Sequence, residues 1–563
     1  MSQPSDEPPE ADPDDESEPD DERAAEDAAD AAREVGDADD GDADGTTGGD
    51  EDAVDPDEDD GDADGTAGDD EDAANADVDD ADGTAGGTDE DAANADAGHD
   101  GRPSAARGRP ATPWWRRWLV PAIVFAVTAL IYALVAGPRT EGPSPNNHFS
   151  ILAQSWLDGH LGLEGRPPHL NDWACYDEEM HAVCPPRAQL REGEHWRWYV
   201  SFPPFPSVLV LPMVALFGLD FSGPLFWAIL AGLAPAFLFV LLRRLREERI
   251  SPRSFKEDLV LVAVFALGTV YFPTAVHGSV WFAAQVVASI LLVLFFHGAI
   301  GIKHPLLAGV ALALCFWTRP STSLWALFFL LEAMRVSRRA DAPDAPPDAS
   351  VWRKLGVWLG GVRWRGVIRP CLVFSAPILA VGAVAMWMNE ARFEDPFEFG
   401  HAYLMIRWRP RIEKWGLFNY HYLSKNLAVF LASLPWLSAT APYLKISRHG
   451  LAIWVTSPNL IPALWPKRVT PLMGSLFTVT GLVALLDLCY QNSGWVQFGY
   501  RFALDYMPAL IVLLALSRRR FGVGFGLLLA AAIVVNTFGA ITFDRAAVFY
   551  DDDATQERVF QPD

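Results

Sequence analysis

The feature that most constrains this chain is a series of long apolar segments that begins at residue 119. Residues 119–136 form a run of 18 almost entirely apolar residues, which is long enough for a helix to cross a lipid bilayer. Further apolar segments follow through residue 540. Because membrane barrels show short segments of alternating hydrophobicity instead, these runs predict an all-α polytopic membrane protein.

The apolar segments predict about 11 transmembrane helices, all within a membrane domain at residues 111–545. The expected spans lie near residues 119–136, 223–242, 258–274, 280–301, 305–318, 321–335, 371–389, 450–465, 469–489, 503–517 and 521–540. The apolar stretch at 427–445 is broken by Pro435 and Pro442, so we expect it to form a helix on the outer face instead.

The first hundred residues have a very different composition. They contain 43 Asp and Glu but only two basic residues, whereas residues 101–563 carry a net charge of +11. The sequence GDADGT at residue 41 recurs at residue 61, and large apolar side chains are almost absent. Such a segment cannot offset the entropy of ordering its chain, so residues 1–110 are expected to form a disordered, solvated acidic tail. Binding of a basic partner or of cations is the alternative role for this charge.

The distribution of Lys and Arg predicts the sidedness of the loops, because basic residues in short loops favour the cytoplasm. Arg116 and Arg117 place the N-terminus inside, so residues 137–203 become the first extracytoplasmic loop. The basic stretch 243–256 is then expected inside, which allows only one span between the two. We therefore interpret residues 202–218, which contain four prolines, as a juxtamembrane helix on the outer face. The same reasoning places residues 390–449 and the C-terminal tail 546–563 outside.

Two cysteines, Cys175 and Cys184, lie in the first outer loop. A disulfide between them is expected, because this loop faces an oxidising compartment. A metal site with the nearby His181 and His195 is the alternative, although the spacing of the cysteines is not that of a zinc knuckle.

Basic residues are unusually frequent in the outer segment 390–426. It contains Arg392, Arg407, Arg409, Arg411, Lys414 and Lys425. A solvated surface or contact with anionic lipid headgroups would account for them. The alternative is a phosphate site at the membrane boundary, because the guanidinium group offers a planar pair of donors that matches phosphate.

Two further polar positions lie at the predicted outer ends of apolar segments. Arg319 and Pro320 separate two short apolar stretches, which indicates either a tight turn or a cavity above a helix pair. Arg501 and Asp505 are four residues apart, a spacing that places them on one face of an α-helix as an ion pair. Charged residues at the membrane edge are also candidates for function.

An amphipathic helix is predicted directly after the first span. Within residues 142–163, Phe149, Leu152 and Trp156 share one face at helical spacing. Pro145 and Asn146 stand where such a helix would begin.

Together, these motifs resemble the GT-C superfamily of integral-membrane glycosyltransferases, in particular bacterial relatives of the dolichyl-phosphate-mannose protein mannosyltransferases and the lipid A aminoarabinose transferase. The matching motifs are, in chain order, NNHFSILAQSWLDGHL, FPPFPSVLVLPMVALFG, LRRLREE, ALCFWTRPST and QFGYRFALDYMP. The resemblance implies an enzyme of the bacterial inner membrane that takes a sugar from a polyprenyl-phosphate carrier. The acceptor would be a lipid, glycan or protein of the envelope on the extracytoplasmic face, and nucleic acid is not an expected partner.

The resemblance also implies a catalytic Asp at the end of the first span, near a divalent cation in some members. Here Asn146 and Asn147 stand at the expected acidic positions, and an amide cannot accept a proton as a carboxylate does. The general base is then expected elsewhere in the loop. Asp172 is the first candidate, and Glu141 or Asp158 the next.

Binding of donor and acceptor is expected from polar residues on the same face. The candidate binding residues are Asn146, Asn147, His148, Arg319, Arg407, Arg411, Lys425, Arg501 and Asp505. Two other functions stay open, a non-catalytic membrane relative and a transporter or flippase of a lipid-linked substrate. A flippase would need polar groups near mid-membrane and repeated halves, whereas the spans show few charges and no evident inverted repeat.

Overall fold

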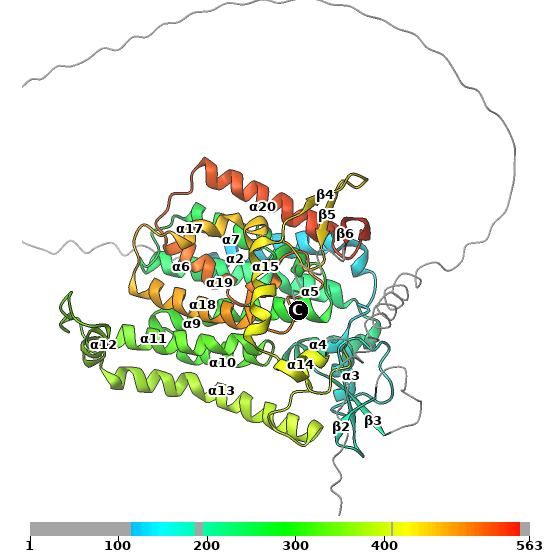
Figure 1. Ribbon diagram of the computed structural model, residues 1–563. Helices are drawn as coiled ribbons and strands as arrows, with labels where there is room; N and C mark the ends of the chain where they lie inside the picture. The colour runs from blue at the N-terminus through cyan, green and yellow to red at the C-terminus, as the bar shows by residue number, and fades with distance from the viewer. Residues whose placement is uncertain (1–113, 186–194, 407–408, 552–563) are drawn as a thin grey trace, which may run out of the picture. The chain divides into compact units, whose positions relative to one another are not determined.

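The computed structural model describes residues 114–185, 195–406 and 409–551. Contacts divide the chain into Met1–Ser104 and Ala105–Asp563. The predicted acidic tail, residues 1–110, lies outside the described residues. All of the elements below belong to the second unit, which Figure 1 shows as a stack of helices with two small sheets.

The described chain is mainly helical. Its α-helices are α2 (Trp114–Ala136), α3 (His148–Leu157), α4 (Phe205–Phe217), α5 (Gly223–Ala231), α6 (Leu233–Glu247), α7 (Phe255–Leu267), α8 (Tyr271–Ala275), α9 (Val280–Ala299), α10 (Pro305–Phe316), α11 (Trp325–Ser337), α12 (Val351–Gly360), α13 (Trp364–Phe393), α14 (Arg409–Trp415), α15 (Leu423–Ala432), α16 (Ile453–Thr456), α17 (Ile461–Leu464), α18 (Pro471–Leu488), α19 (Met507–Leu516) and α20 (Val523–Thr542). The 3₁₀ turns used below are η1 (Gly137–Thr140), η5 (Pro320–Leu324), η7 (Pro458–Leu460), η8 (Arg501–Asp505) and η9 (Ala547–Phe549).

Six described helices are long and apolar enough to cross a membrane. They are Arg117–Thr140, Gly223–Glu247, Val280–Ile302, Trp364–Phe393, Pro471–Leu488 and Val523–Thr542. They match six of the predicted spans. Four other predicted spans form helices of 10 to 13 residues, namely α7, α10, α11 and α19. By length and composition, the chain is therefore an integral membrane protein with six such helices in its described part, and the predicted total of 11 is not confirmed.

The predicted span at 450–465 is wrong as a continuous helix. It consists of α16, η7 and α17, because Pro458 and Pro462 cannot donate the backbone hydrogen bonds that a helix needs. Side-chain hydrogen bonds join this interrupted segment to α20. Asn536 of α20 donates to the carbonyl of Thr456 at 2.6 Å, and Asn459 donates to the carbonyl of Phe525 at 3.1 Å. Such bonds allow irregular backbone to be buried among membrane helices.

Loops that were predicted to share the cytoplasmic side contact one another. Arg253 donates to the backbone carbonyls of Leu514 and Arg519 at 2.9 and 2.7 Å. The backbone NH of Lys467 donates to the carbonyl of Ser517 at 2.9 Å. The charge pattern thus groups these loops at one end of the helices, as the structure does, while the orientation of the protein in a membrane stays a prediction.

The core is built around α9, which packs on α6, α10 and α19. Close approach of α10 and α13 requires glycine at position 309, where an added Cβ would lie 2.2 Å from the carbonyl oxygen of Phe374. Small residues at such crossings let membrane helices pack closely. The rings of Phe329 and Phe374 stack at 3.9 Å in the same region and join α11 to α13.

Two three-stranded sheets lie in loops predicted outside, where the all-α prediction expected none. The first has the order β2-β1-β3, with β1 (Trp173–Asp177) antiparallel to β2 (Ala182–Val183) and β3 (Trp196–Val200). The second has the order β4-β5-β6. It consists of β4 (Trp436–Leu437), β5 (Leu444–Ser447) and β6 (Tyr550–Asp551), the last of which follows η9. Part of the predicted C-terminal tail is therefore paired with β5.

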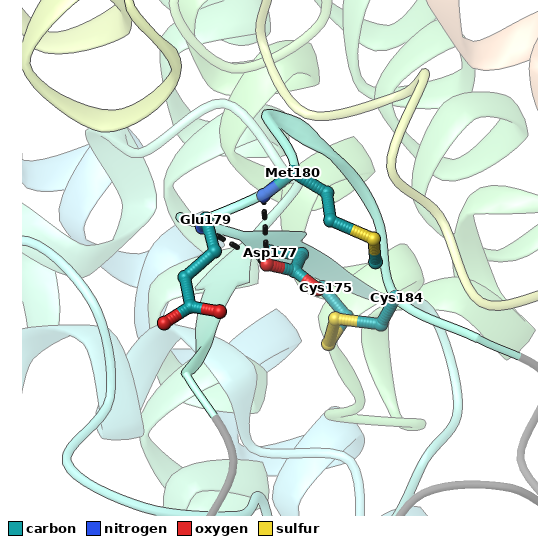
Figure 2. Close-up of a disulfide and its surroundings, with 5 residues drawn as sticks. All are labelled: Cys175, Asp177, Glu179, Met180 and Cys184. Atoms are coloured by element: carbon teal, nitrogen blue, oxygen red, sulfur yellow. Dashed lines mark hydrogen bonds between the residues drawn. A yellow bond between two sulfur atoms is a disulfide. The ribbon is translucent and has the colours of Figure 1, made fainter.

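The expected disulfide between Cys175 and Cys184 is present and joins β1 to the residue after β2. Figure 2 shows it beside the β1–β2 turn. There the Asp177 carboxylate accepts hydrogen bonds from the backbone NH groups of Glu179 and Met180 at 3.0 and 3.1 Å. An Asp side chain that accepts from the amides two and three residues ahead in this way fixes a tight turn. The crosslink and the turn hold the small sheet in one conformation.

Candidate functional site

Asp172, the first candidate for a base, is held by three elements. It immediately precedes β1 with a φ of 57°, an uncommon conformation that Asp tolerates better than most residues. Its Oδ2 accepts a hydrogen bond of 2.8 Å from Nε1 of Trp281, near the start of α9. Its backbone carbonyl accepts one of 3.2 Å from Ser201 Oγ. The carboxylate is thus fixed in direction and is half-buried.

His148, at the start of α3, supports the segment that carries Asp172. Its Nε2 lies 2.9 Å from the carbonyl oxygen of Asn171, and its ring stacks on Trp173 at 4.5 Å. Burial lowers the pKa of His148 to about 4. The ring is therefore neutral at pH 7, with its proton on Nε2 where it can be donated to the carbonyl. His148 was predicted to bind substrate, but its side chain is fully buried.

Arg501 lies against the same region from the other end of the chain. The backbone of its turn, η8, is fixed by Gln497, whose Oε1 accepts from the Arg501 NH at 2.9 Å, and by Gln285, whose Nε2 donates to the Arg501 carbonyl at 3.2 Å. The guanidinium carbon lies 4.9 Å from the ring centre of Phe282 and 5.5 Å from that of Phe502. Two aromatic faces therefore hold the cation in place.

The charge of Arg501 is tuned by its surroundings. Burial and the nearby Arg319 lower the pKa of Arg501 to about 9, while Asp172 and Tyr490 act in the opposite direction. The guanidinium therefore stays charged at pH 7. Asp172 and Tyr490 are close enough to affect it electrostatically, although Asp172 comes from a distant part of the sequence.

The predicted ion pair between Arg501 and Asp505 is wrong. Asp505 instead accepts hydrogen bonds of 2.6 Å from Nε and Nη2 of Arg319, and another of 2.6 Å from Ser321 Oγ. The reason is local. Residues 501–505 form a 3₁₀ turn, in which residues four apart point about 120° away from each other. The turn at Arg319–Pro320 was therefore predicted, but Asp505 as the partner of Arg319 was not.

Tyr490 is the site residue that sequence reasoning missed. Burial and Asp172 raise its pKa, whereas Arg319 and Arg501 act to lower it. The phenol thus lies within electrostatic range of all three side chains. Asn426 donates to the Tyr490 carbonyl at 2.7 Å. At the end of an apolar run, this tyrosine resembled an ordinary interfacial aromatic residue, so its sequence position offered no signal.

Two of the remaining basic candidates, Arg411 and Lys425, lie in α14 and α15. Lys425 is buried in α15, next to Asn426. Arg411 is half-buried in α14, and its carbonyl accepts from the Tyr422 hydroxyl at 3.1 Å. Arg407 lies outside the described residues. The structure thus brings Asp172, Arg319, Arg501 and Asp505 to one region, and places Lys425 on the helix that also binds the Tyr490 backbone.

The other candidates do not join this cluster through any contact among the described residues. Glu141 is exposed after η1. Asp158 is exposed at the end of α3, where it accepts from the Gln154 amide at 3.0 Å. Asn146 and Asn147 are half-buried at the start of α3, and the Asn146 carbonyl accepts from the Val280 NH at 3.1 Å. This bond fixes the start of α3 to the start of α9, beside Trp281.

A divalent cation near Asp172 stays a prediction. Trp281 donates an N–H to the Asp172 carboxylate, and the Arg501 cation lies within electrostatic range of it, whereas Mg²⁺ and similar ions are held by several oxygen ligands. Within residues 114–185, 195–406 and 409–551, no group of three His, Cys, Asp or Glu is placed to bind a metal. The described side chains in this region are two carboxylates, Asp172 and Asp505, and the Tyr490 phenol, beside the guanidinium groups of Arg319 and Arg501.

Comparisons with known proteins give limited information. No protein-family model matches the chain, and no curated protein matches it by sequence. One similar solved structure is ArnT from Cupriavidus metallidurans bound to undecaprenyl phosphate, at 14% identity and a TM-score of 0.38 over 71% of this chain and 60% of that one. Another is the Archaeoglobus fulgidus oligosaccharyltransferase tethered with an acceptor peptide, at 14% identity and a TM-score of 0.37 over 76% and 56%. The chain thus spans 60% or less of either neighbour, and at these TM-scores neither likeness identifies its function.

Proposed function

We propose that this protein is a membrane glycosyltransferase that transfers a sugar from a polyprenyl-phosphate donor to an acceptor on the extracytoplasmic face. The observation that supports it is the convergence of Asp172, from the first outer loop, with Tyr490 and Arg501, from the last one. Both loops were predicted to lie on the outer side. The order of motifs along the chain, which resembles that of GT-C enzymes, agrees with this proposal.

Arg501 is the best-placed phosphate ligand. Its Nε donates to the Gly494 carbonyl at 3.3 Å, and the flanking rings of Phe282 and Phe502 keep its plane fixed. A planar guanidinium group binds phosphate oxygens through paired, charge-assisted hydrogen bonds. Arg319 differs, because its Nε and Nη2 are occupied by Asp505. It would contribute positive potential, which is attractive to a phosphate.

Asp172 is the proposed general base. An acceptor hydroxyl would attack the anomeric carbon as the bond from that carbon to the phosphate oxygen breaks. The electron pair of that bond leaves with the polyprenyl phosphate, which Arg501 stabilises, and the hydroxyl proton passes to Asp172. Because Trp281 holds one carboxylate oxygen, the carboxylate keeps its direction during this step. Proton transfer to a positioned base typically contributes 10²–10⁴-fold to the rate.

The decisive experiment is sugar transfer in detergent from a panel of radiolabelled polyprenyl-phosphate sugars. We expect Asp172→Asn to lower kcat by at least about 100-fold and Arg501→Gln to weaken use of the donor. Glu141→Gln and Asp158→Asn are matched carboxylate controls and should keep wild-type rates. Activity that survives Asp172→Asn would rule out Asp172 as the base. Absence of turnover with every donor would contradict the enzymatic function.

A flippase of a lipid-linked substrate is the second candidate, and one observation favours it. The broken segment 450–465 contains Asn459 and contacts Asn536 of α20, so polar groups lie among membrane helices. Discontinuous helices are common in transporters. Proteoliposomes loaded with a fluorescent polyprenyl-phosphate sugar distinguish the two functions. Movement of the donor between leaflets without transfer to an acceptor would favour the flippase.

A further inference from the structure

Among the side chains whose exposure the structure describes, the most exposed aromatic residue on the predicted cytoplasmic side lies on α12. Trp352 is 81% exposed and Val351 76%. The helix is nevertheless well anchored. Ser350 caps its start by accepting from the Arg353 NH at 3.3 Å, and Trp358 packs against the cluster of Ala333, Val362 and Val367. One face of α12 therefore binds the protein while its other apolar side chains point away from it.

Basic residues surround this exposed apolar face. Arg353, Lys354, Arg363, Arg365 and Arg369 lie within 19 residues, and no acidic residue occurs from position 349 to 389. All five side chains are exposed, and Lys354 donates to the Pro347 carbonyl at 2.6 Å. In the described parts of the chain, Arg353, Arg363, Arg365 and Arg369 form no ion pair. Their charge is therefore not balanced by the protein itself.

The same surface continues into a membrane span. α13 begins at Trp364, which is 49% exposed, and its exposed apolar residues then follow at Ile368, Leu372 and Leu379. Figure 1 shows α12 at the end of α11 and α13. The order along the chain is thus an amphipathic helix, a group of arginines with a tryptophan, and then the lipid-facing side of a span. This order is typical of a membrane–water boundary.

We propose that α12 and the start of α13 form a binding surface for the headgroups of anionic phospholipids in the membrane that surrounds the protein. Trp352, Val351 and Leu355 would enter the boundary between headgroups and acyl chains, and the arginines would contact phosphates. Clusters of Lys and Arg next to a span attract anionic lipid in this way, with each charge changing the equilibrium by about fivefold. This surface is separate from the Asp172 cluster and does not depend on the proposed transferase function.

The test is the lipid preference of the full chain in phosphatidylcholine proteoliposomes. Electron spin resonance measures how strongly spin-labelled phosphatidylglycerol and spin-labelled phosphatidylcholine associate with the protein. We expect wild type to prefer phosphatidylglycerol, and this preference should weaken when the ionic strength is raised from about 0.1 M to 1 M, because the Debye length falls from about 10 Å to 3 Å. Arg365→Gln with Arg369→Gln should lower the preference by at least half.

Two variants make the result specific. Arg249→Gln with Lys256→Gln removes the same charge from exposed positions that lie near Glu247, Glu248 and Glu257, so it should leave the preference unchanged. Arg365→Lys with Arg369→Lys keeps the charge and should keep most of the preference. The proposal is overturned if wild type shows no preference for phosphatidylglycerol, if the control pair has the same effect as the arginine pair, or if the Lys variant behaves like the Gln variant.

Discussion

Replacement of Asp505 with Asn provides a quantitative test of the buried pair that organises the candidate site. The Asp505 side chain is fully buried and accepts three hydrogen bonds of 2.6 Å, two from Arg319 and one from Ser321. In the variant, the amide would leave the Arg319 charge without its main partner, although only 17% of that side chain is exposed. Removing one member of a buried ion pair costs about 3–5 kcal/mol.

The structure places the expected cost at the lower end of this range. Asp487 also lies near Arg319, so the arginine keeps a second acidic residue beside it. We therefore expect a loss of about 3 kcal/mol in the free energy of unfolding. The assay is unfolding by added SDS in mixed micelles, followed by circular dichroism, for wild type, Asp505→Asn, Arg319→Gln and the double variant.

The double-mutant cycle distinguishes the observed pair from the one that sequence spacing predicted. Asp505 and Arg319 should show a coupling energy of at least about 2 kcal/mol, because residues in one ion pair are not additive. Asp505 and Arg501 should couple by less than about 1 kcal/mol, since they share no hydrogen bond. Equal coupling of Asp505 to the two arginines would refute the geometry of the site.

Three further predictions test the fold and its outer loop. Because burial lowers the pKa of His148 to about 4, the unfolded chain binds a proton between about pH 6.5 and 4 that the folded chain does not. The contribution of His148 to the free energy of unfolding is therefore full above pH 6.5 and falls by up to about 3 kcal/mol towards pH 4. In SDS titrations, this fall should be smaller for His148→Phe. Gly309→Ala should lower stability by about 1–3 kcal/mol, because the new methyl group meets the carbonyl of the facing helix, whereas Gly481→Ala in α18, with open space around it, should be neutral in the same titration. Reduction of the Cys175–Cys184 disulfide should make the β1–β3 sheet accessible to protease, because the crosslink closes a short loop within this small sheet. The membrane helices should persist, as measured by far-UV circular dichroism. Loss of the helical signal would contradict this prediction.

The parts of the fold that were predictable are those set by local composition. The apolar runs located the six long helices, and the Lys and Arg pattern correctly grouped loops such as those of Arg253 and Lys467, because both signals act over a few residues. The disulfide was also predictable, since its two cysteines share one loop. The small sheets were not, because they depend on contacts between residues far apart in the sequence, such as the pairing of β5 with β6 and the hydrogen bond from the Cys175 NH to the Tyr403 carbonyl at 2.9 Å.

The candidate site was only partly predictable for a related reason. Asp172, Arg319, Arg501 and Asp505 were each selected because charges near a membrane are costly unless they are used. Their partners depend on packing between helices that are distant in sequence, so spacing alone gave Asp505 the wrong arginine. Tyr490 carried no charge and therefore no signal, although it lies among the selected residues.

The measurement that tests the central claim most directly is the affinity of the purified protein for polyprenyl phosphate without a sugar. It isolates the phosphate from the rest of the reaction. Wild type should bind this lipid, and Arg501→Gln should bind it about 10–100-fold more weakly, because a hydrogen bond to a charged group contributes about 1.5–3 kcal/mol. Lys414→Gln, which neutralises an exposed lysine of α14, should bind like wild type. Equal affinity of wild type and Arg501→Gln for polyprenyl phosphate would contradict the proposed site.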